Sequence, residues 1–159
     1  MANLTIRDYT PADLDAVLRL DLDAWPDRDA PEARGAADAP DLQEIEAVYQ
    51  RDGAFLVCVD DDGVMLGMVG LQRHKGRVYE MRRMRVVLSA QRRGIGRRLV
   101  EAVEQRARAL GATQIVLQTT LQQLGAQRLY EACGYELTHT SVLQDAHARF
   151  DVMHYRKLV

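Results

Sequence analysis

The sequence of 159 residues lacks the features that mark several special classes of protein. No apolar run approaches the roughly 18–20 residues that a membrane-spanning helix needs. There are only two cysteines, Cys58 and Cys133, without a CxxC pair or a nearby histidine pair, so we expect neither a zinc site nor a disulfide framework. The N-terminal residues show no basic stretch followed by an apolar one, which argues against a cleaved secretory signal. We therefore expect a cytoplasmic protein.

The composition is that of an ordinary globular domain. Hydrophobic residues make up 47% of the chain and charged residues 28%. The length suits one hydrophobic core, and we expect a single domain over residues 1–159.

Charge is distributed very unevenly along the chain. Residues 1–62 contain 16 acidic residues against five arginines, whereas residues 73–98 contain ten basic residues and one acid, Glu80. This segregation indicates two surfaces, one that attracts an anion and one that attracts a cation. The alternative is that the opposite charges simply pair with each other in the fold.

Hydrophobic periodicity predicts the element order βααβββαβαββ, an α+β sheet with helices on both faces. A helix is predicted to start at Thr10, with Pro11 in its first turn, and to continue to Trp25. The proline-rich stretch 26–40 reads as a mobile loop. The remaining predicted helices are 42–49, 94–110 and 124–132, and the predicted strands with readable bounds are 3–9, 54–59, 64–72, 78–88, 113–119 and 150–158.

The densest chemical signal is the run Gln91-Arg92-Arg93-Gly94-Ile95-Gly96-Arg97, between a predicted strand and a predicted helix. Glycines let the backbone N–H groups of a turn approach a ligand closely, and a helix N-terminus favours negative charge. The run therefore predicts a site for a diphosphate. The chain contains no Gly-Lys pair and no complete GxGxxG, which disfavours an NTP-hydrolysing loop and a dinucleotide-binding loop.

Two segments of the sequence resemble a known family. Met84-Arg85-Val86 followed by QRRGIG at 91–96 is similar to motif A of the GNAT-type N-acetyltransferases, with the pattern Q/R-x-x-G-x-G/A. The run LYEACGY at 129–135 is similar to the LYExxGF/Y segment of the same superfamily. The resemblance implies a GNAT-like mixed, mostly antiparallel central sheet. It also implies an acetyl-CoA-dependent N-acetyltransferase that acts by direct transfer in a ternary complex.

The resemblance implies which residues bind acetyl-CoA. The backbone of the loop would hold the pyrophosphate, the preceding strand would pair with the pantetheine arm, and a glutamine stands where many relatives have a cofactor-contacting asparagine. A bulge near 85–88 would let the two central strands separate to admit that arm. We expect no metal. The implied cofactor-binding residues are Met84, Arg85, Val86, Arg92, Arg93, Gly94, Ile95, Gly96, Arg97 and Gln123.

The resemblance also implies catalytic roles. Tyr130 matches the acid that protonates the departing CoA thiolate, and a phenol with a pKa of about 10 is protonated at neutral pH. Glu80 is similar to the glutamate that serves as general base through water. Gln118 stands where some protein-acetylating relatives have a catalytic glutamate, which argues mildly against that activity. The four histidines match no family motif, and we assign them no role.

The acceptor is the least defined part of the prediction. An acidic N-terminal segment favours a cationic small amine or peptide amine, and possible dimerisation is implied because the family often forms homodimers. The rival functions are a non-catalytic acyl-CoA-binding sensor domain and a nucleic-acid-binding module built on 73–98; the second has little aromatic support. The acidic residues in question are Asp27, Asp29, Glu32, Asp38, Asp41, Glu44 and Glu46.

Overall fold

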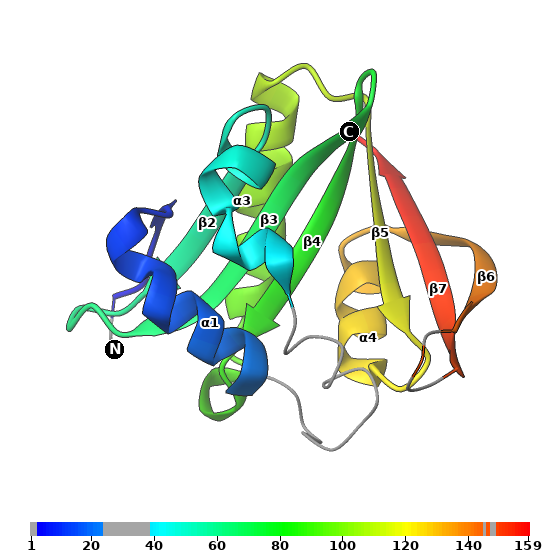
Figure 1. Cartoon of the computed structure of the whole chain (residues 1–159). Helices are drawn as coiled ribbons and strands as arrows, with labels where there is room; N and C mark the ends of the chain where they lie inside the picture. The colour runs from blue at the N-terminus through cyan, green and yellow to red at the C-terminus, as the bar shows by residue number, and fades with distance from the viewer. Residues whose placement is uncertain (1–2, 24–38, 145, 147–148) are drawn as a thin grey trace.

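The computed structural model describes residues 3–23, 39–144, 146 and 149–159. Its strands form one seven-stranded sheet in the order β1-β2-β3-β4-β5-β7-β6 (Figure 1). Only β4 and β5 pair in parallel, so the expected mixed, mostly antiparallel sheet is confirmed. The predicted mobile loop lies outside the described residues, except for positions 39–40. The strands are β1 (Thr5–Asp8), β2 (Ala54–Val59), β3 (Met65–Lys75), β4 (Val78–Val86), β5 (Gln114–Thr120), β6 (Glu136–Gln144) and β7 (Arg149–Leu158).

Three α-helices lie close to their predicted positions: α1 (Leu14–Asp23), α3 (Ile95–Ala109) and α4 (Leu124–Ala132). A short 3₁₀ turn, η1 (Pro11–Asp13), leads into α1, and the Asp13 carboxylate accepts the backbone N–H of Thr10 at 2.9 Å. This is the predicted helix start. The guanidinium of Arg7 donates to the same carboxylate at 2.7 Å, which ties β1 to α1.

The prediction of one continuous helix over 42–49 is wrong, because the segment is divided into two short helical turns. The chain forms a 3₁₀ turn, η2 (Pro40–Gln43), and a π turn, η3 (Glu46–Gln50), because the backbone leaves the helical region at Glu44, where φ is −135° and ψ is 46°. Tyr49 is fully buried and packs edge-on against Phe55, with 5.2 Å between ring centroids. The apolar spacing predicted the buried face correctly but could not reveal the break.

Helices or turns lie on both faces of the sheet, as predicted. Alternate residues of β2 belong to two separate cores: Leu56 and Cys58 pack with α3 and α4, whereas Phe55 and Val57 pack with α1, η2 and η3. Figure 1 shows α1 and the two turns in front of the sheet and α3 behind it.

The central strands β4 and β5 separate along their length. They pair only from Val78–Met81 to Gln114–Leu117, although both continue, and α4 is visible behind the opening between them (Figure 1). The expected bulge exists, but it lies at Arg83 and not at 85–88. The register with β3 slips there, and Arg83 adopts a left-handed conformation with φ 56°. The side chains of Arg82 and Arg83 consequently project toward the same face, where they meet Tyr49 and Asp41.

Candidate active site

The loop before α3 leaves the N-terminus of that helix open to a ligand. Gly94 precedes the helix with φ +80°, a conformation that strongly favours glycine, and no side chain caps the first turn. Gly96 serves a different purpose, because a Cβ there would lie 2.9 Å from Cδ2 of Leu129 on α4. The two glycines of the motif therefore allow a tight turn and a close contact between helices. The uncapped N–H groups and the helix dipole suit an anion such as a pyrophosphate.

The arginines of this loop differ in their freedom. The guanidinium of Arg97 reaches the carbonyl of Ala132 at 3.3 Å, and that of Arg98 reaches the carbonyl of Leu4 at 3.4 Å. Arg92, which has φ +64°, and Arg93 are exposed. These two side chains are the better placed to add charge to a phosphate held by the backbone.

The end of β4 presents an edge that β5 does not cover. Beyond Met81 no residue of β4 pairs with β5 among the described residues. The carbonyl of Met84 accepts a hydrogen bond from the Arg85 guanidinium at 3.0 Å, and that of Val86 accepts one from the Gln91 amide at 3.0 Å. The side chains of Met84 and Val86 pack against the α3–α4 side of the sheet. An extended ligand with amide groups fits beside such an edge in the manner of an added strand.

Tyr130 lies on α4, on the same side of the sheet. Its side chain is buried, with ring centroids 6.1 Å from Tyr135 and 6.3 Å from Tyr155. Burial raises the pKa of Tyr130 to about 12, against the opposing effect of the Arg85 charge. No described residue forms a hydrogen bond with its hydroxyl. The phenol is therefore protonated at neutral pH and available as a proton donor.

Glu80 lies on the opposite face of the sheet from Tyr130. Its neighbours on β4, Tyr79 and Met81, point into the core, so the side chain of Glu80 points to the other face. Met81 is the last residue of β4 that pairs with β5. Its carboxylate is 3.6 Å from the Nε of Arg82 and 4.0 Å from the Nδ1 of His74. The two predicted catalytic side chains thus flank the start of the strand separation from its two sides.

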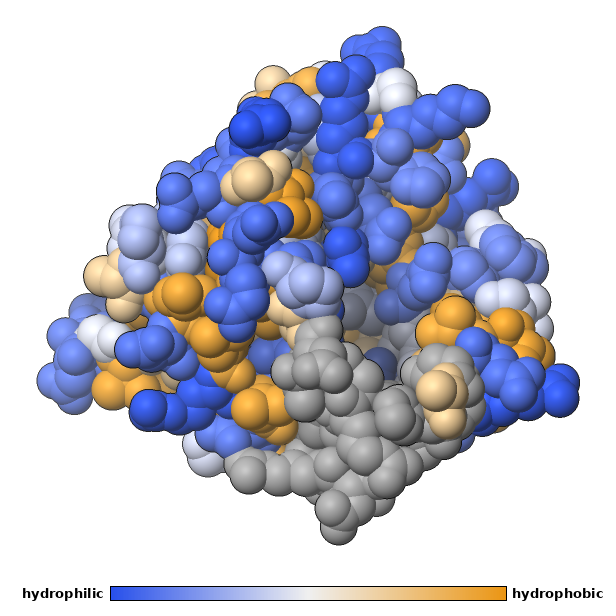
Figure 2. All heavy atoms as spheres, viewed as in Figure 1, coloured by the Kyte–Doolittle hydropathy of each residue, from blue (hydrophilic) through white to orange (hydrophobic). Residues whose placement is uncertain are grey.

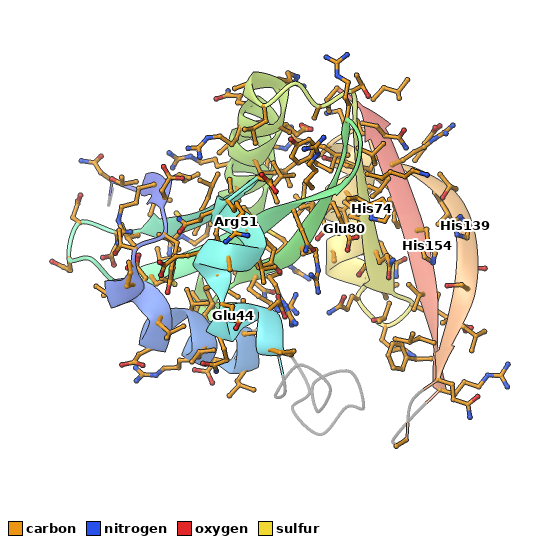
Figure 3. The ribbon with its side chains drawn as sticks, turned by 45° about the horizontal axis from the view of Figure 1, so that its top comes forward. Glu44, Arg51, His74, Glu80, His139 and His154 are labelled. Carbon is orange, nitrogen blue, oxygen red and sulfur yellow. The ribbon has the colours of Figure 1, made fainter. Side chains whose placement is uncertain are left out.

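Glu80 also lines a cavity of about 390 Å³ on the part of the sheet that the helices leave open. The cavity brings together side chains from β3, β4, β5, β6 and β7, among them Gln118 and three of the four histidines (Figure 3). Figure 2 shows hydrophilic residues gathered over the same end of the sheet. No sequence motif joins these histidines, because their meeting depends on strand order; the fourth, at 147, lies outside the described residues. The three are His74, His139 and His154.

The residues at the end of β5 hold polar groups beside the separated strands. Gln123 precedes α4, and its Oε1 accepts a hydrogen bond from the Thr119 hydroxyl at 2.7 Å. The side-chain NH₂ of Gln123 forms no hydrogen bond with any residue that the structure describes. The buried hydroxyl of Thr120 has no hydrogen-bond partner among the residues that the structure describes. A buried orphan of this kind is what a polar ligand in the opening would satisfy.

Some arginines of the basic segment 73–98 pair with acidic residues of the N-terminal segment inside the fold. Arg83 donates to both oxygens of Asp41, at 2.7 and 3.0 Å, and Arg85 donates to the buried Asp21 at 3.1 Å. Burial opposes ionisation of Asp41, but hydrogen bonds from Arg83 and Tyr49 outweigh it and lower the pKa of that carboxyl. Burial raises the pKa of Asp21 despite the two arginines.

Three of the seven acidic residues expected to favour a cationic acceptor lie in the described part of the chain. Asp41 is committed to Arg83, while Glu44 and Glu46 are exposed. The other four acids named for it lie outside the described residues. They are Asp27, Asp29, Glu32 and Asp38.

Two further properties concern the described part of the chain. None of its helices has the length and apolar character that crossing a bilayer requires. Within the same residues, no group of three or more His, Cys, Asp or Glu side chains is arranged to hold a metal ion.

Two separated central strands and an open helix N-terminus beside them form a site suited to an extended ligand that carries a diphosphate, as an acyltransferase with such an acyl carrier requires. The model of the acetyltransferase (GNAT) family matches residues 14–135, and the chain belongs to this family. It is an acetyl-CoA-dependent N-acetyltransferase.

Individual relatives agree with this assignment. Over 147 residues, 87% of this chain and 90% of the relative, the sequence is 29% identical to aminoglycoside N(6')-acetyltransferase type 1 of Stenotrophomonas maltophilia. The fold matches a GNAT-family acetyltransferase of Staphylococcus aureus with a TM-score of 0.82 and 20% identity, covering 98% of this chain and 99% of the other. It also matches yncA of Salmonella typhimurium, whose structure holds its cofactor acetyl-CoA, with a TM-score of 0.75 and 22% identity over 98% and 94% of the two chains.

Proposed function

We propose that residues 1–159 form one domain that transfers the acetyl group of acetyl-CoA directly to a primary amine within a ternary complex. The observation that carries this proposal is the position of Glu80 and Tyr130 on opposite faces of the sheet, beside the point where β4 and β5 part. A thioester in the opening would have a base on the side of the attacking amine and an acid on the side of the leaving sulfur.

Acetyl-CoA fits the groups that the opening presents. The open turn before α3 would hold the pyrophosphate through the backbone N–H groups of the loop, with Arg92 and Arg93 adding charge. The uncovered edge of β4 would pair with the amides of the pantetheine arm, and the NH₂ of Gln123 would donate a hydrogen bond to the cofactor. The proposed cofactor-binding residues are Met84, Arg85, Val86, Arg92, Arg93, Gly94, Ile95, Gly96, Arg97 and Gln123.

The residues account for every proton in the reaction. An alkylammonium with a pKa of about 10 costs roughly 4–5 kcal/mol to deprotonate at pH 7, and the Glu80 carboxylate takes that proton through water. The free amine attacks the thioester carbon, and a backbone N–H near Val86 stabilises the oxyanion. When the C–S bond breaks, Tyr130 donates its proton to the thiolate. The nitrogen loses its second proton as the amide forms. Of the two protons that the ammonium gives up in each turnover, one is released to solvent and the other restores the proton that Tyr130 has donated.

Direct transfer is favoured over a covalent acetyl-enzyme. Cys58 is completely buried, and burial raises the pKa of its thiol. Burial likewise raises the pKa of Cys133, and no described histidine lies beside either sulfur in a hydrogen bond or ion pair. A nucleophilic cysteine needs the opposite environment, one that lowers its pKa.

For the acceptor we favour a cationic small amine or a peptide amine. Among the described residues, Glu80 is the only carboxylate that lines the cavity, and it would attract an ammonium group. Two relatives are named aminoglycoside N(6')-acetyltransferases, so amino sugars should be among the first acceptors that are assayed. The free cysteines are consistent with a reducing cytoplasm, where we place the protein. A homodimer would form through the exposed edge strand β6.

Two measurements test the proposal. Calorimetry should detect acetyl-CoA and CoA binding, and a free-thiol assay should detect CoA release with at least one amine of a panel of amino sugars, polyamines, amino acids and peptides. Failure to bind either ligand at millimolar concentration would refute the proposal. Binding without CoA release for any amine would instead make the chain a sensor domain.

A further inference from the structure

The cavity beside Glu80 extends well beyond the groups that acetyl transfer uses. From Glu80 on β4 it crosses β5 and β7 and ends at β6, where its lining includes His154 and His139 (Figure 3). Two spacings between strands separate β4 from β7, which is roughly 10 Å. The far end of the cavity is therefore too distant from Glu80 to act on the reacting nitrogen itself.

The two histidines at the far end are fixed in place. Their rings stack at 4.1 Å between centroids with 10° between planes. His154 Nε2 shares a hydrogen bond of 2.7 Å with the Ser141 hydroxyl, and His139 Nδ1 shares one of 3.0 Å with the Thr138 hydroxyl. The second nitrogen of each ring, Nδ1 of His154 and Nε2 of His139, has no hydrogen bond to any residue that the structure describes.

The charge on the cavity wall differs between its two ends. Glu80 supplies the negative charge at one end, next to Arg82 and His74. At the other end burial and the neighbouring His139 lower the pKa of His154, against the opposing effect of the Glu80 charge, so its ring is neutral at physiological pH. Arg156, between the ends, is paired with the Glu136 carboxylate at 2.9 Å. A neutral imidazole such as that of His154 offers a ring nitrogen that accepts a hydrogen bond from an N–H or O–H group.

We infer that His139 and His154 determine acceptor specificity by binding a second polar group of the acceptor while its reacting ammonium lies at Glu80. The acceptor class is then a primary amine with a further amino or hydroxyl group several bonds away, as in a diamine, an amino alcohol or an amino sugar. The inference rests on the proposed function, because it places the acceptor amine at Glu80. It adds to that function the reason why a simple monoamine is a poor substrate.

The test compares three linear acceptors of equal chain length: 1-aminohexane, 6-amino-1-hexanol and 1,6-diaminohexane. The wild-type enzyme should favour the diamine over the monoamine by about 10-fold or more in kcat/KM, since one hydrogen bond to a charged group is lost in the monoamine. In His154→Phe the stacked ring is kept but both nitrogens are lost, and the preference should fall toward unity through a higher KM for the diamine. His74→Phe makes the same change at the Glu80 end and should retain the preference.

Each outcome bears on the inference. Equal kcat/KM for the three acceptors in the wild type, or an undiminished preference in His154→Phe, overturns it while the transfer reaction stands. If the wild type binds acetyl-CoA but acetylates no amine, the proposed function fails and the inference fails with it. Thermal unfolding of each variant verifies folding, and His139→Phe, with the same expected loss of preference, replaces His154→Phe should that variant not fold.

Discussion

The hydroxyl of Tyr130 can be removed with little disturbance to the surrounding structure. The ring is buried and contacts Tyr135 and Tyr155, but no described residue hydrogen-bonds the hydroxyl. Tyr130→Phe keeps the ring contacts and breaks no hydrogen bond within the protein, so the free energy of unfolding should change by less than about 1 kcal/mol. Any large loss of activity in this variant therefore reports on chemistry.

We expect Tyr130→Phe to lower kcat by about 10- to 100-fold, or roughly 1.4–2.7 kcal/mol in the activation free energy. The affinity for acetyl-CoA should not change, because the proposed function places its pyrophosphate at the loop and its pantetheine arm at the β4 edge, away from the Tyr130 hydroxyl. Turnover is measured by the release of free thiol, and affinity by calorimetry.

The matched control is Tyr135→Phe. This neighbouring hydroxyl donates to Glu104 at 3.4 Å, while Lys157 also holds that carboxylate at 2.9 Å. The control should lose a little stability and retain kcat. Unchanged turnover in Tyr130→Phe, or an equal loss in both variants, would remove Tyr130 from the mechanism.

The pH dependence gives a second check on Tyr130. A general acid must be protonated to donate, so its contribution disappears as the pH rises through its pKa. Burial raises the pKa of Tyr130 to about 12, from the usual value of about 10. The wild-type kcat should therefore show no alkaline fall caused by Tyr130 below about pH 11. An alkaline limb near pH 9 that is absent from Tyr130→Phe would contradict this reasoning.

Three further predictions concern the base, the loop and the core. Glu80→Gln should lower kcat by about 100-fold and flatten the acidic limb of the pH–rate profile; an unaltered limb places the base elsewhere. Gly94→Ala, at φ +80°, should cost about 1 kcal/mol of stability and weaken acetyl-CoA binding in calorimetry, whereas Gly63→Ala, at φ +79° in a distant hairpin, should bring the same strain and normal binding. Lys157→Met should cost about 2–4 kcal/mol in denaturant unfolding because it leaves the buried carboxylate of Glu104 unpaired, and a loss below 1 kcal/mol would contradict that account.

The parts of the fold that follow local rules could be predicted from the sequence. The turn at Gly94 needs a residue that tolerates positive φ, and the helix start at Thr10 needs a side chain three residues later that bonds back to its N–H. Both requirements are visible in neighbouring residues. The hairpin between β2 and β3 belongs to the same class, since Gly63 adopts φ +79° and Asp60 accepts two backbone N–H groups within the turn.

The features that depend on strand register could not be read in advance. The bulge at Arg83 is set by its bonds to Asp41 and by the contact of Gly70 with the Tyr49 ring, where a Cβ would come within 2.7 Å. The meeting of His139 with His154 requires a slip of one residue between Leu137 and His139 in the pairing of β6 with β7. One residue of register moves a side chain to the other face, and no local pattern records it.

The irregularity at Arg83 has a consequence for how this chain can tolerate change. Deleting one residue there would restore an ordinary pleat, allow hydrogen bonds to continue between β4 and β5 past Met81, and close the sheet. Such a protein would gain hydrogen bonds between backbone groups, and it would lose the opening between β4 and β5 in which the proposed function places acetyl-CoA. Selection for folding stability alone would favour the sheet with continuous pairing between β4 and β5. The extra residue therefore marks a position where the protein gives up stability in favour of activity.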